Sequence, residues 1–240
     1  MAQPGRVGSS RLTRRQLIMK VLIAGGHGKI ALLLARQLSA AGHQAYNLVR
    51  NADHAPELRA TGAEPVLFDL ERGSADDLGP VLADVDAVVF AAGAGPGSGL
   101  ERKYSVDLGG SVLLADACRA AGVRAFVQIS TIGAGEPPAA GSDEVWAAYL
   151  DAKTKAEDDL RARDLDWTIV RPGRLTDDPG TGRVRLENAP AAPGSVPRAD
   201  VAAVITELLI NPAPGRTLVL TGGDVPVGAA VAALRREQIG

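Results

Sequence analysis

The sequence predicts a single α/β domain in which helices flank a doubly wound parallel sheet. Short aliphatic runs alternate with helical periods of apolar residues along most of the 240 residues, as expected when buried parallel strands alternate with crossover helices. Hydrophobic residues make up 46% of the chain but aromatic residues only 3%, so aliphatic side chains must form the core. The length suits one core of this kind better than two.

The predicted elements follow one another as strand and helix. Strands are expected at Lys20–Ala24, Gln44–Val49, Pro65–Phe68, Ala87–Ala91, Arg124–Ile129, Trp167–Val170 and Thr217–Leu220. Helices are expected at Ile30–Ala41, Pro56–Ala60, Ala75–Leu82, Glu101–Ala121, Asp143–Arg163, Ala199–Ile210 and Val227–Arg236. Residues 173–197 are rich in Gly, Pro and Arg without a regular period, so we interpret them as a binding loop or a small subdomain, part of a small C-terminal substrate region.

The N-terminal segment differs from the rest of the chain. Residues 1–16 are rich in Arg, Gly and Ser and show no apolar period, so we expect a disordered tail over residues 1–18 and one domain over residues 19–240. The pair Arg14 and Arg15 resembles a twin-arginine export signal. The apolar residues that would follow it, Val21 to Ile23, are needed by the first strand, so we expect a cytoplasmic protein.

Composition argues against several classes of protein. The formal net charge is −2 and no basic stripe is present, so a nucleic-acid partner is not expected. No aliphatic run reaches the roughly 18 residues that a bilayer span requires, so no membrane partner is expected. Cys118 is the one cysteine and lies in an apolar helical pattern, which predicts a buried structural thiol. The three histidines lack ligands at metal-binding spacing, so we predict no metal site.

The clearest motif lies between the first strand and the first helix. Gly25 permits a tight turn, Gly28 lets the backbone approach a pyrophosphate, and Ala31 lets helix and strand pack closely. The free amides and the positive end of the helix would then face the phosphates. The alternative is a plain strand-to-helix turn. We interpret the motif as a Rossmann-type dinucleotide site formed by Gly25, Gly26, His27, Gly28, Lys29 and Ile30.

The end of the second strand indicates which nucleotide is preferred. An NAD site usually has an acidic residue here to bind the ribose 2′-hydroxyl, whereas this chain has Arg50. A guanidinium offers a fixed fork of donors that suits a 2′-phosphate, and Lys29 is a candidate to assist it. The alternative is a solvated surface arginine. The residue type therefore predicts NADP(H) over NAD(H).

Together these features resemble the atypical, NAD(P)H-binding branch of the short-chain dehydrogenase/reductases, whose members include NAD(P)-dependent epimerase/dehydratase-like proteins. The similarity runs from Met19 to the end and also rests on Val66–Leu70, Ala91–Ala94, Leu165–Gly173 and Pro197–Ala202. The resemblance implies that Asp69 lies near the adenine amine and that Ala92 and Gly93 line the adenosine pocket. It implies further cofactor contacts from Leu70, Ala91, Lys153 and Pro172.

A Tyr-x-x-x-Lys pattern, Tyr149 to Lys153, carries the catalytic part of the resemblance. Side chains at these two positions share one face of a helix. The resemblance implies that Tyr149 is the acid/base and that Lys153 stabilises its phenolate and binds the nicotinamide ribose. Thr131, or its neighbour Ser130, would polarise the substrate oxygen.

Asp107 departs from the family pattern, because it stands where the family has asparagine. A carboxylate near Lys153 would weaken the effect of the lysine on Tyr149. The alternative interpretation of Asp107 is a solvated helix residue.

Two functions follow from these residues. Intact Tyr149 and Lys153 favour an NADP(H)-dependent oxidoreductase or epimerase-like enzyme for a small carbonyl or hydroxyl substrate, acting as a monomer or homodimer. Asp107 and the small C-terminal region favour a non-catalytic NADP(H)-binding regulator or redox sensor that uses the same pocket.

Overall fold

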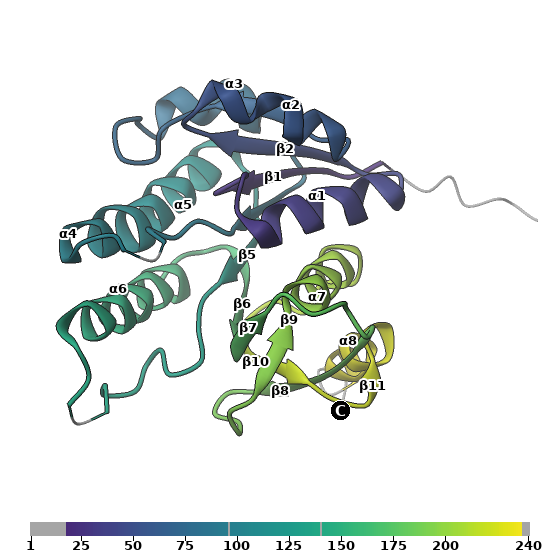
Figure 1. Ribbon diagram of the computed structural model, residues 1–240. Coiled ribbons are helices and arrows are strands. Elements are labelled where there is room, and N and C mark those ends of the chain that lie inside the picture. The colour runs from purple at the N-terminus through teal and green to yellow at the C-terminus, as the bar shows by residue number, and fades with distance from the viewer. Residues whose placement is uncertain (1–17, 96, 140, 237–240) are drawn as a thin grey trace, which may run out of the picture.

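A nine-stranded sheet forms the centre of the computed structural model, which describes residues 18–95, 97–139 and 141–236 (Figure 1). Its strands, in spatial order, are β3 (Glu64–Leu67), β2 (Gln44–Val49), β1 (Lys20–Ala24), β4 (Ala87–Phe90), β5 (Ala125–Ile129), β6 (Asp166–Pro172), β10 (Arg216–Gly222), β8 (Arg183–Asn188) and β11 (Val225–Pro226). The strands from β3 to β10 are parallel, whereas β8 pairs antiparallel with both β10 and β11. The predicted doubly wound α/β fold is therefore confirmed.

Helices cover both faces of the sheet (Figure 1). Two of them, α1 (Lys29–Ala40) and α7 (Arg198–Ile210), pack against each other on one face, and α8 (Val227–Arg236) packs against α7. The other face carries α3 (Gly79–Leu82), α5 (Gly110–Ala121) and α6 (Glu144–Arg161). Short helices η1 (Ala52–His54), α2 (Ala55–Ala60) and η2 (Asp76–Leu78) complete the connections on the β2–β3 side. Each face has its own aliphatic core, because the central strands are buried on both sides.

The helix expected over Glu101–Ala121 is interrupted, and this is the first correction. The segment consists of α4 (Leu100–Arg102), the π-helix η3 (Lys103–Gly109) and α5. A π-helical turn holds more residues than an α-helical turn, and such turns occur frequently at functional sites. Here it turns two charged residues, Lys103 and Asp107, into the interior.

The region over residues 173–197 is the second correction. It contains β8 and a separate two-stranded parallel sheet of β7 (Arg174–Thr176) and β9 (Ser195–Pro197). In β8 only Val184 and Leu186 alternate with charged residues, which is too short a pattern to stand out, and the register of β8 depends on distant partners in β10. The region is therefore an extension of the sheet rather than an irregular loop.

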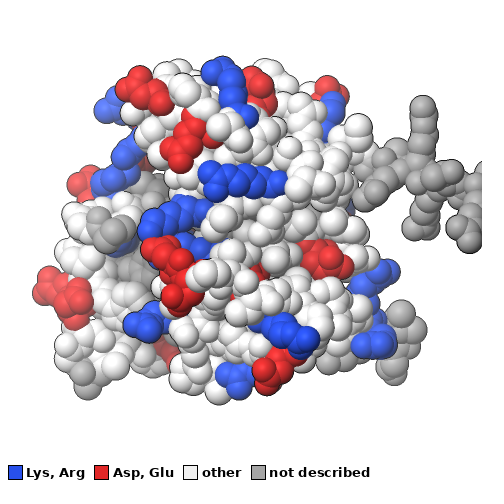
Figure 2. All heavy atoms as spheres, turned by 45° about the vertical axis from the view of Figure 1, so that its right-hand side comes forward, with Lys and Arg blue, Asp and Glu red and all other residues white. Residues whose placement is uncertain are grey.

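The chain ends and the surface complete the description. Most of the expected tail lies outside the described residues, although Ile18 is described and exposed. No helix among the described residues is long and apolar enough to cross a membrane. Acidic and basic side chains are interspersed on the face shown in Figure 2.

Candidate functional site

A cavity of about 240 Å³ opens at the carboxyl ends of the central strands. The chain leaves β1 towards β2 on one side and reaches β4 on the other, so the strand order reverses here. In open α/β sheets such a switch point forms the crevice in which ligands bind. The cavity is lined by Gly25, Gly26, His27, Gly28, Leu48, Val49, Arg50, His54, Phe68, Asp69, Leu70, Glu71, Ala91, Ala92, Gly93, Ala94, Arg102 and Val106.

The glycine loop at the floor of this cavity is shaped for a close approach. Gly25 has a φ of +75°, and a Cβ there would lie 2.5 Å from the Cα of Ala92. The carbonyl of Gly26 accepts a hydrogen bond of 2.8 Å from the buried Asn47 amide, which fixes the loop against β2. Gly28 is the N-cap residue of α1 and has no side chain to accept a hydrogen bond from the first turn. That turn also has no acidic residue. The amides of that turn are thus available to an anion such as a pyrophosphate.

Two arginines and a glutamate form the end of the cavity beyond β2 and β3. Arg50 Nη1 lies 3.4 Å from Glu71 Oε2, and Arg102 Nη2 lies 2.8 Å from the same oxygen. The hydrogen bonds from Arg102 and Ser105 lower the pKa of Glu71, and Glu71 in turn raises the pKa of Arg102. Two guanidinium groups thus share the Glu71 carboxylate, and Asp69, which also lines the cavity, adds a second negative charge near Arg102.

Two histidine rings stack beside the glycine loop. The ring centres of His27 and His54 are 3.6 Å apart, and His27 Nε2 lies 2.7 Å from Glu57 Oε2. Both rings line the cavity. The stack therefore forms a wall between the phosphate loop and α2. Within residues 18–95, 97–139 and 141–236, no group of three or more His, Cys, Asp or Glu side chains is arranged to hold a metal ion.

Lys29 points away from the cavity. Its Nζ lies 2.6 Å from Asp177 Oδ2, and Arg198 Nη1 is 2.6 Å from the other carboxylate oxygen. Both cations, Lys29 first, lower the pKa of Asp177. Lys29 therefore connects α1 to the segment after β7 and does not join Arg50.

Lys153 and Asp107 form a buried ion pair next to the cavity. Lys153 Nζ lies 3.1 Å from Asp107 Oδ1, and their side chains are 4% and 0% exposed. The ammonium also contacts the carbonyls of Ala92 at 3.4 Å and Ile129 at 3.3 Å, which join it to the ends of β4 and β5. Asp107 Oδ2 accepts a hydrogen bond from the Ala94 amide at 3.0 Å. Asp107 is therefore not a solvated helix residue, and that alternative is wrong.

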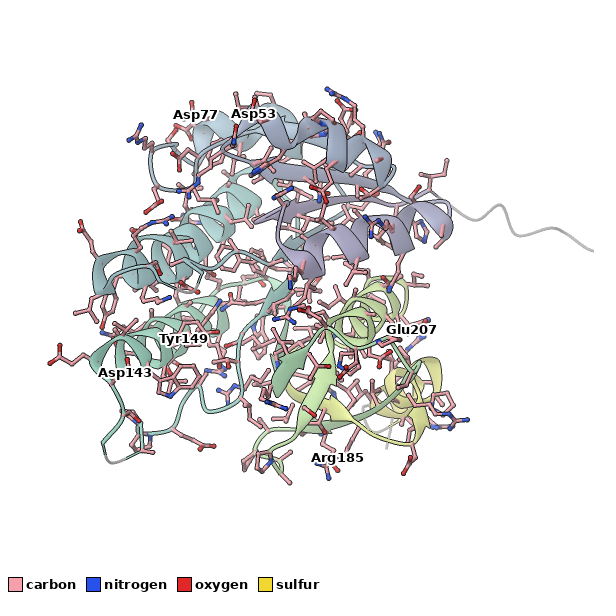
Figure 3. All side chains as sticks on the ribbon, in the orientation of Figure 1. Asp53, Asp77, Asp143, Tyr149, Arg185 and Glu207 are labelled. Carbon is pink, nitrogen blue, oxygen red and sulfur yellow. The ribbon has the colours of Figure 1, made fainter. Side chains whose placement is uncertain are left out.

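Tyr149 lies near the start of α6, half-buried (Figure 3). The centre of its ring is 5.9 Å from Lys153 Nζ and 5.6 Å from Lys103 Nζ. The Trp146 ring packs against it at 5.3 Å between centres. Tyr149 and Lys153 are thus brought together, although Tyr149 does not line the cavity itself.

The two candidate hydroxyl groups after β5 have different surroundings. Ser130 is buried, and its Oγ donates a hydrogen bond of 2.5 Å to Glu157 Oε1. Glu157 is itself held by Arg161 and Arg171, each with a nitrogen 2.6 Å from Oε2. Thr131 is half-buried and makes a long contact of 3.3 Å to the Ile132 carbonyl. The Ser130 hydroxyl is therefore used in a buried hydrogen bond within the protein. The Thr131 hydroxyl has only a long contact and is available to a ligand.

Most of the expected cofactor residues line the cavity, and four do not; one of them is Lys153, which lies next to the cavity in its ion pair with Asp107. Ile30 packs on the core, Pro172 ends β6 in a buried position, and Lys29 lies outside as described above. Residues that the sequence analysis missed are His54, Glu71, Arg102 and Lys103. Only Lys103 had a usable sequence signal, because it stands four residues before Asp107 in an apolar helical pattern.

Comparisons with known proteins identify the family and support the fold. The family model of NAD(P)H-binding proteins matches residues 25–212. YhfK of Bacillus subtilis, named an uncharacterized sugar epimerase, is 34% identical over 89% of this chain and 99% of its own length. A Bacillus halodurans protein given the provisional name NAD-dependent epimerase/dehydratase has a TM-score of 0.82 at 35% identity, over 90% of this chain and 99% of that one. The oxidoreductase ylbE of Lactococcus lactis has a TM-score of 0.78 at 28% identity, over 91% and 97%.

Proposed function

This chain belongs to the NAD(P)H-binding family, and from that premise we propose that it is an NADP(H)-dependent oxidoreductase or epimerase-like enzyme acting on a small carbonyl or hydroxyl compound. One observation carries the proposal. Lys153 contacts the carbonyl of Ala92, which lines the cavity, and lies 5.9 Å from the Tyr149 ring, so the pair lies beside the cavity at the end of β4. The names of two relatives, an uncharacterized sugar epimerase and an oxidoreductase, support an activity of this kind.

The residues present fit a nicotinamide dinucleotide. Gly25 and Gly28 leave room for a pyrophosphate at the uncapped start of α1. Asp69 and Ala92 line the part of the cavity expected to hold the adenosine. When bound, such a cofactor supplies hydride exchange with a substrate carbon.

Tyr149 is proposed to move the proton that accompanies the hydride. In reduction its hydroxyl would donate a proton to the substrate oxygen, and in oxidation its phenolate would accept one. Thr131 would hold the same oxygen by a hydrogen bond and so orient the substrate carbon. Lys153 is held beside the cavity by Asp107 and two carbonyls, and it is proposed to bind the cofactor ribose.

The proposed preference for NADP(H) rests on Arg50 and Arg102. Both line the same end of the cavity and both contact Glu71. A 2′-phosphate carries more negative charge than the Glu71 carboxylate, so it can recruit the guanidinium groups that Glu71 now holds. A ribose 2′-hydroxyl offers no such charge.

A second candidate is a non-catalytic NADP(H)-binding regulator or redox sensor. The observation that favours it is the buried ion pair of Asp107 and Lys153, because the carboxylate cancels a charge that the Tyr-x-x-x-Lys pattern would otherwise direct at Tyr149.

A substrate screen separates the two candidates. The full chain is incubated with NADPH and a panel of quinones, aldehydes and keto compounds, and the loss of NADPH absorbance is followed. Turnover of any compound above the rate of a Lys153→Ala variant supports the enzyme. Tight NADPH binding by calorimetry without turnover in the whole panel supports the regulator, and absence of binding contradicts both.

A further inference from the structure

Lys103 is a second buried lysine beside Tyr149. It lies in η3, is 7% exposed, and its Nζ donates a hydrogen bond of 2.9 Å to the Gly95 carbonyl. That nitrogen is 5.6 Å from the centre of the Tyr149 ring, slightly closer than Lys153 at 5.9 Å. The phenol of Tyr149 therefore lies within electrostatic range of two ammonium groups.

The two ammonium groups differ in their partners. Lys153 is paired with Asp107 at 3.1 Å in a region shielded from water. Within residues 18–95, 97–139 and 141–236, no carboxylate oxygen lies within 4.0 Å of Lys103 Nζ. The charge of Lys153 is largely cancelled by its partner, whereas the charge of Lys103 is not.

We propose that Lys103 is a positioning residue that supplies the net positive charge stabilising the Tyr149 phenolate, in place of the Lys153 charge that Asp107 neutralises. A positive charge at this distance from a half-buried phenol favours its ionised form. The two lysines and Asp107 together leave one net positive charge near the Tyr149 ring.

Other charged groups on α6 face elsewhere. Asp151 accepts a hydrogen bond of 2.8 Å from the hydroxyl of Tyr104, and Lys155 Nζ lies 5.4 Å from the Tyr104 ring. Positions 149 and 151 are about 200° apart around a helix, so this group is on the opposite side from Tyr149. Lys155 is itself paired with Asp151 at 2.7 Å, so it serves as a control lysine on α6 that already has a carboxylate partner and does not face Tyr149.

The test measures the ionisation of Tyr149 directly, without substrate or cofactor. Each variant is titrated with alkali and its phenolate absorbance is compared with that of the same variant carrying Tyr149→Phe. Lys103→Met is expected to move the Tyr149 midpoint upward by about one pH unit, since a neighbouring opposite charge typically shifts ionisation by one or more. Lys103→Arg should retain the wild-type midpoint. Lys155→Met, which removes a lysine elsewhere on α6, should leave the signal of Tyr149 unchanged.

A second comparison tests whether the net charge of the groups near Tyr149 determines its titration midpoint. Asp107→Asn releases Lys153 from its carboxylate, so the Tyr149 midpoint should fall below that of the wild type. The double variant Lys103→Met/Asp107→Asn again has one net positive charge near the phenol, and its midpoint should return to within about half a unit of the wild type.

The inference is wrong if Lys103→Met leaves the Tyr149 midpoint unchanged while the protein retains its melting temperature. Lys103→Gln keeps a donor for the Gly95 carbonyl, and it replaces the methionine variant if that one does not fold. The catalytic meaning of the charge rests on the proposed function, but the titration does not. A chain that turns over no compound therefore contradicts the enzyme and leaves this result standing.

Discussion

At the scale of single residues, Asp107 and Lys153 show what a sequence motif does and does not specify. The resemblance indicated that a carboxylate near Lys153 would weaken its effect, and the two side chains do form a buried pair. The sequence did not indicate the orientation of Ser130, because Glu157, 27 residues away, decides it. Glu71 and Arg102 were missed for the same reason, since residues 31 apart meet only in the folded chain.

Arg50 is expected to determine much of the cofactor preference. Arg50→Glu places a carboxylate beside Glu71, where it would repel a 2′-phosphate. NADPH affinity should fall by about 2 kcal/mol or more, and NADH affinity should change little. Calorimetric titration with both nucleotides measures this. Arg59→Glu, an equal charge change on α2 outside the cavity, is the control. An equal loss for both nucleotides, or no loss, would rule out this role of Arg50.

At the scale of elements, helices and strands with a strong hydrophobic period were predicted well, whereas short elements with a weak period were not. The bounds of β1 and β2 and the start of α8 at Val227 agree with the sequence prediction, because each has a clear hydrophobic pattern. Strand β8 was missed because alternate positions carry Arg183, Arg185 and Glu187, and its pairing with β10 is long-range. The π-helix η3 was missed because its apolar spacing still resembles that of an α-helix.

Asp200 is expected to hold the segment before β8 onto α7. It is 2% exposed and accepts hydrogen bonds from the amides of Thr181 and Gly182, both at 2.9 Å. Asp200→Ala leaves these donors without their partner, which should cost roughly 2–3 kcal/mol, or about 5–10 °C in melting temperature. The exposed Asp178→Ala is the control in a thermal melt. A melting temperature within about 2 °C of the wild type would contradict this account.

At the scale of the whole molecule, the fold was predictable because the apolar residues of nearly every segment follow either a helical or a strand pattern. Aliphatic strands that are buried on both faces leave few alternatives to a parallel sheet between helices. The switch point then follows from strand order, and its place from the glycine loop after β1. The substrate side could not be predicted in this way, because its pocket depends on loops and on β7 to β9, which have no regular pattern.

The free energy of unfolding should decrease as the solution becomes acidic and should stay nearly constant around neutral pH. Ion pairs and hydrogen bonds lower the pKa of Glu71 below 4.5, and those of Asp77, Asp151, Asp164 and Asp177 below 3.8. As the pH falls, these carboxyl groups take up protons in the unfolded chain before they do so in the folded protein. They therefore stabilise the folded state above their unfolded pKa values, and this contribution is lost as the pH falls through their lower folded pKa values. Urea midpoints should therefore be level from about pH 6 to 8 and fall below about pH 4.5. A midpoint that rises on acidification from pH 5 would oppose this prediction.

The proposal that this chain reduces a carbonyl with NADPH rests finally on Tyr149, and one substitution tests it most directly. Tyr149→Phe removes a hydroxyl and leaves the ring against Trp146 and between the two lysines. General acid catalysis contributes about 10²- to 10⁴-fold, so turnover of an accepted carbonyl compound should fall by that factor while NADPH binding is retained. The measurement is kcat for both proteins at saturating NADPH, with the nucleotide Kd from calorimetry. A Tyr149→Phe protein that keeps the full rate would contradict the account.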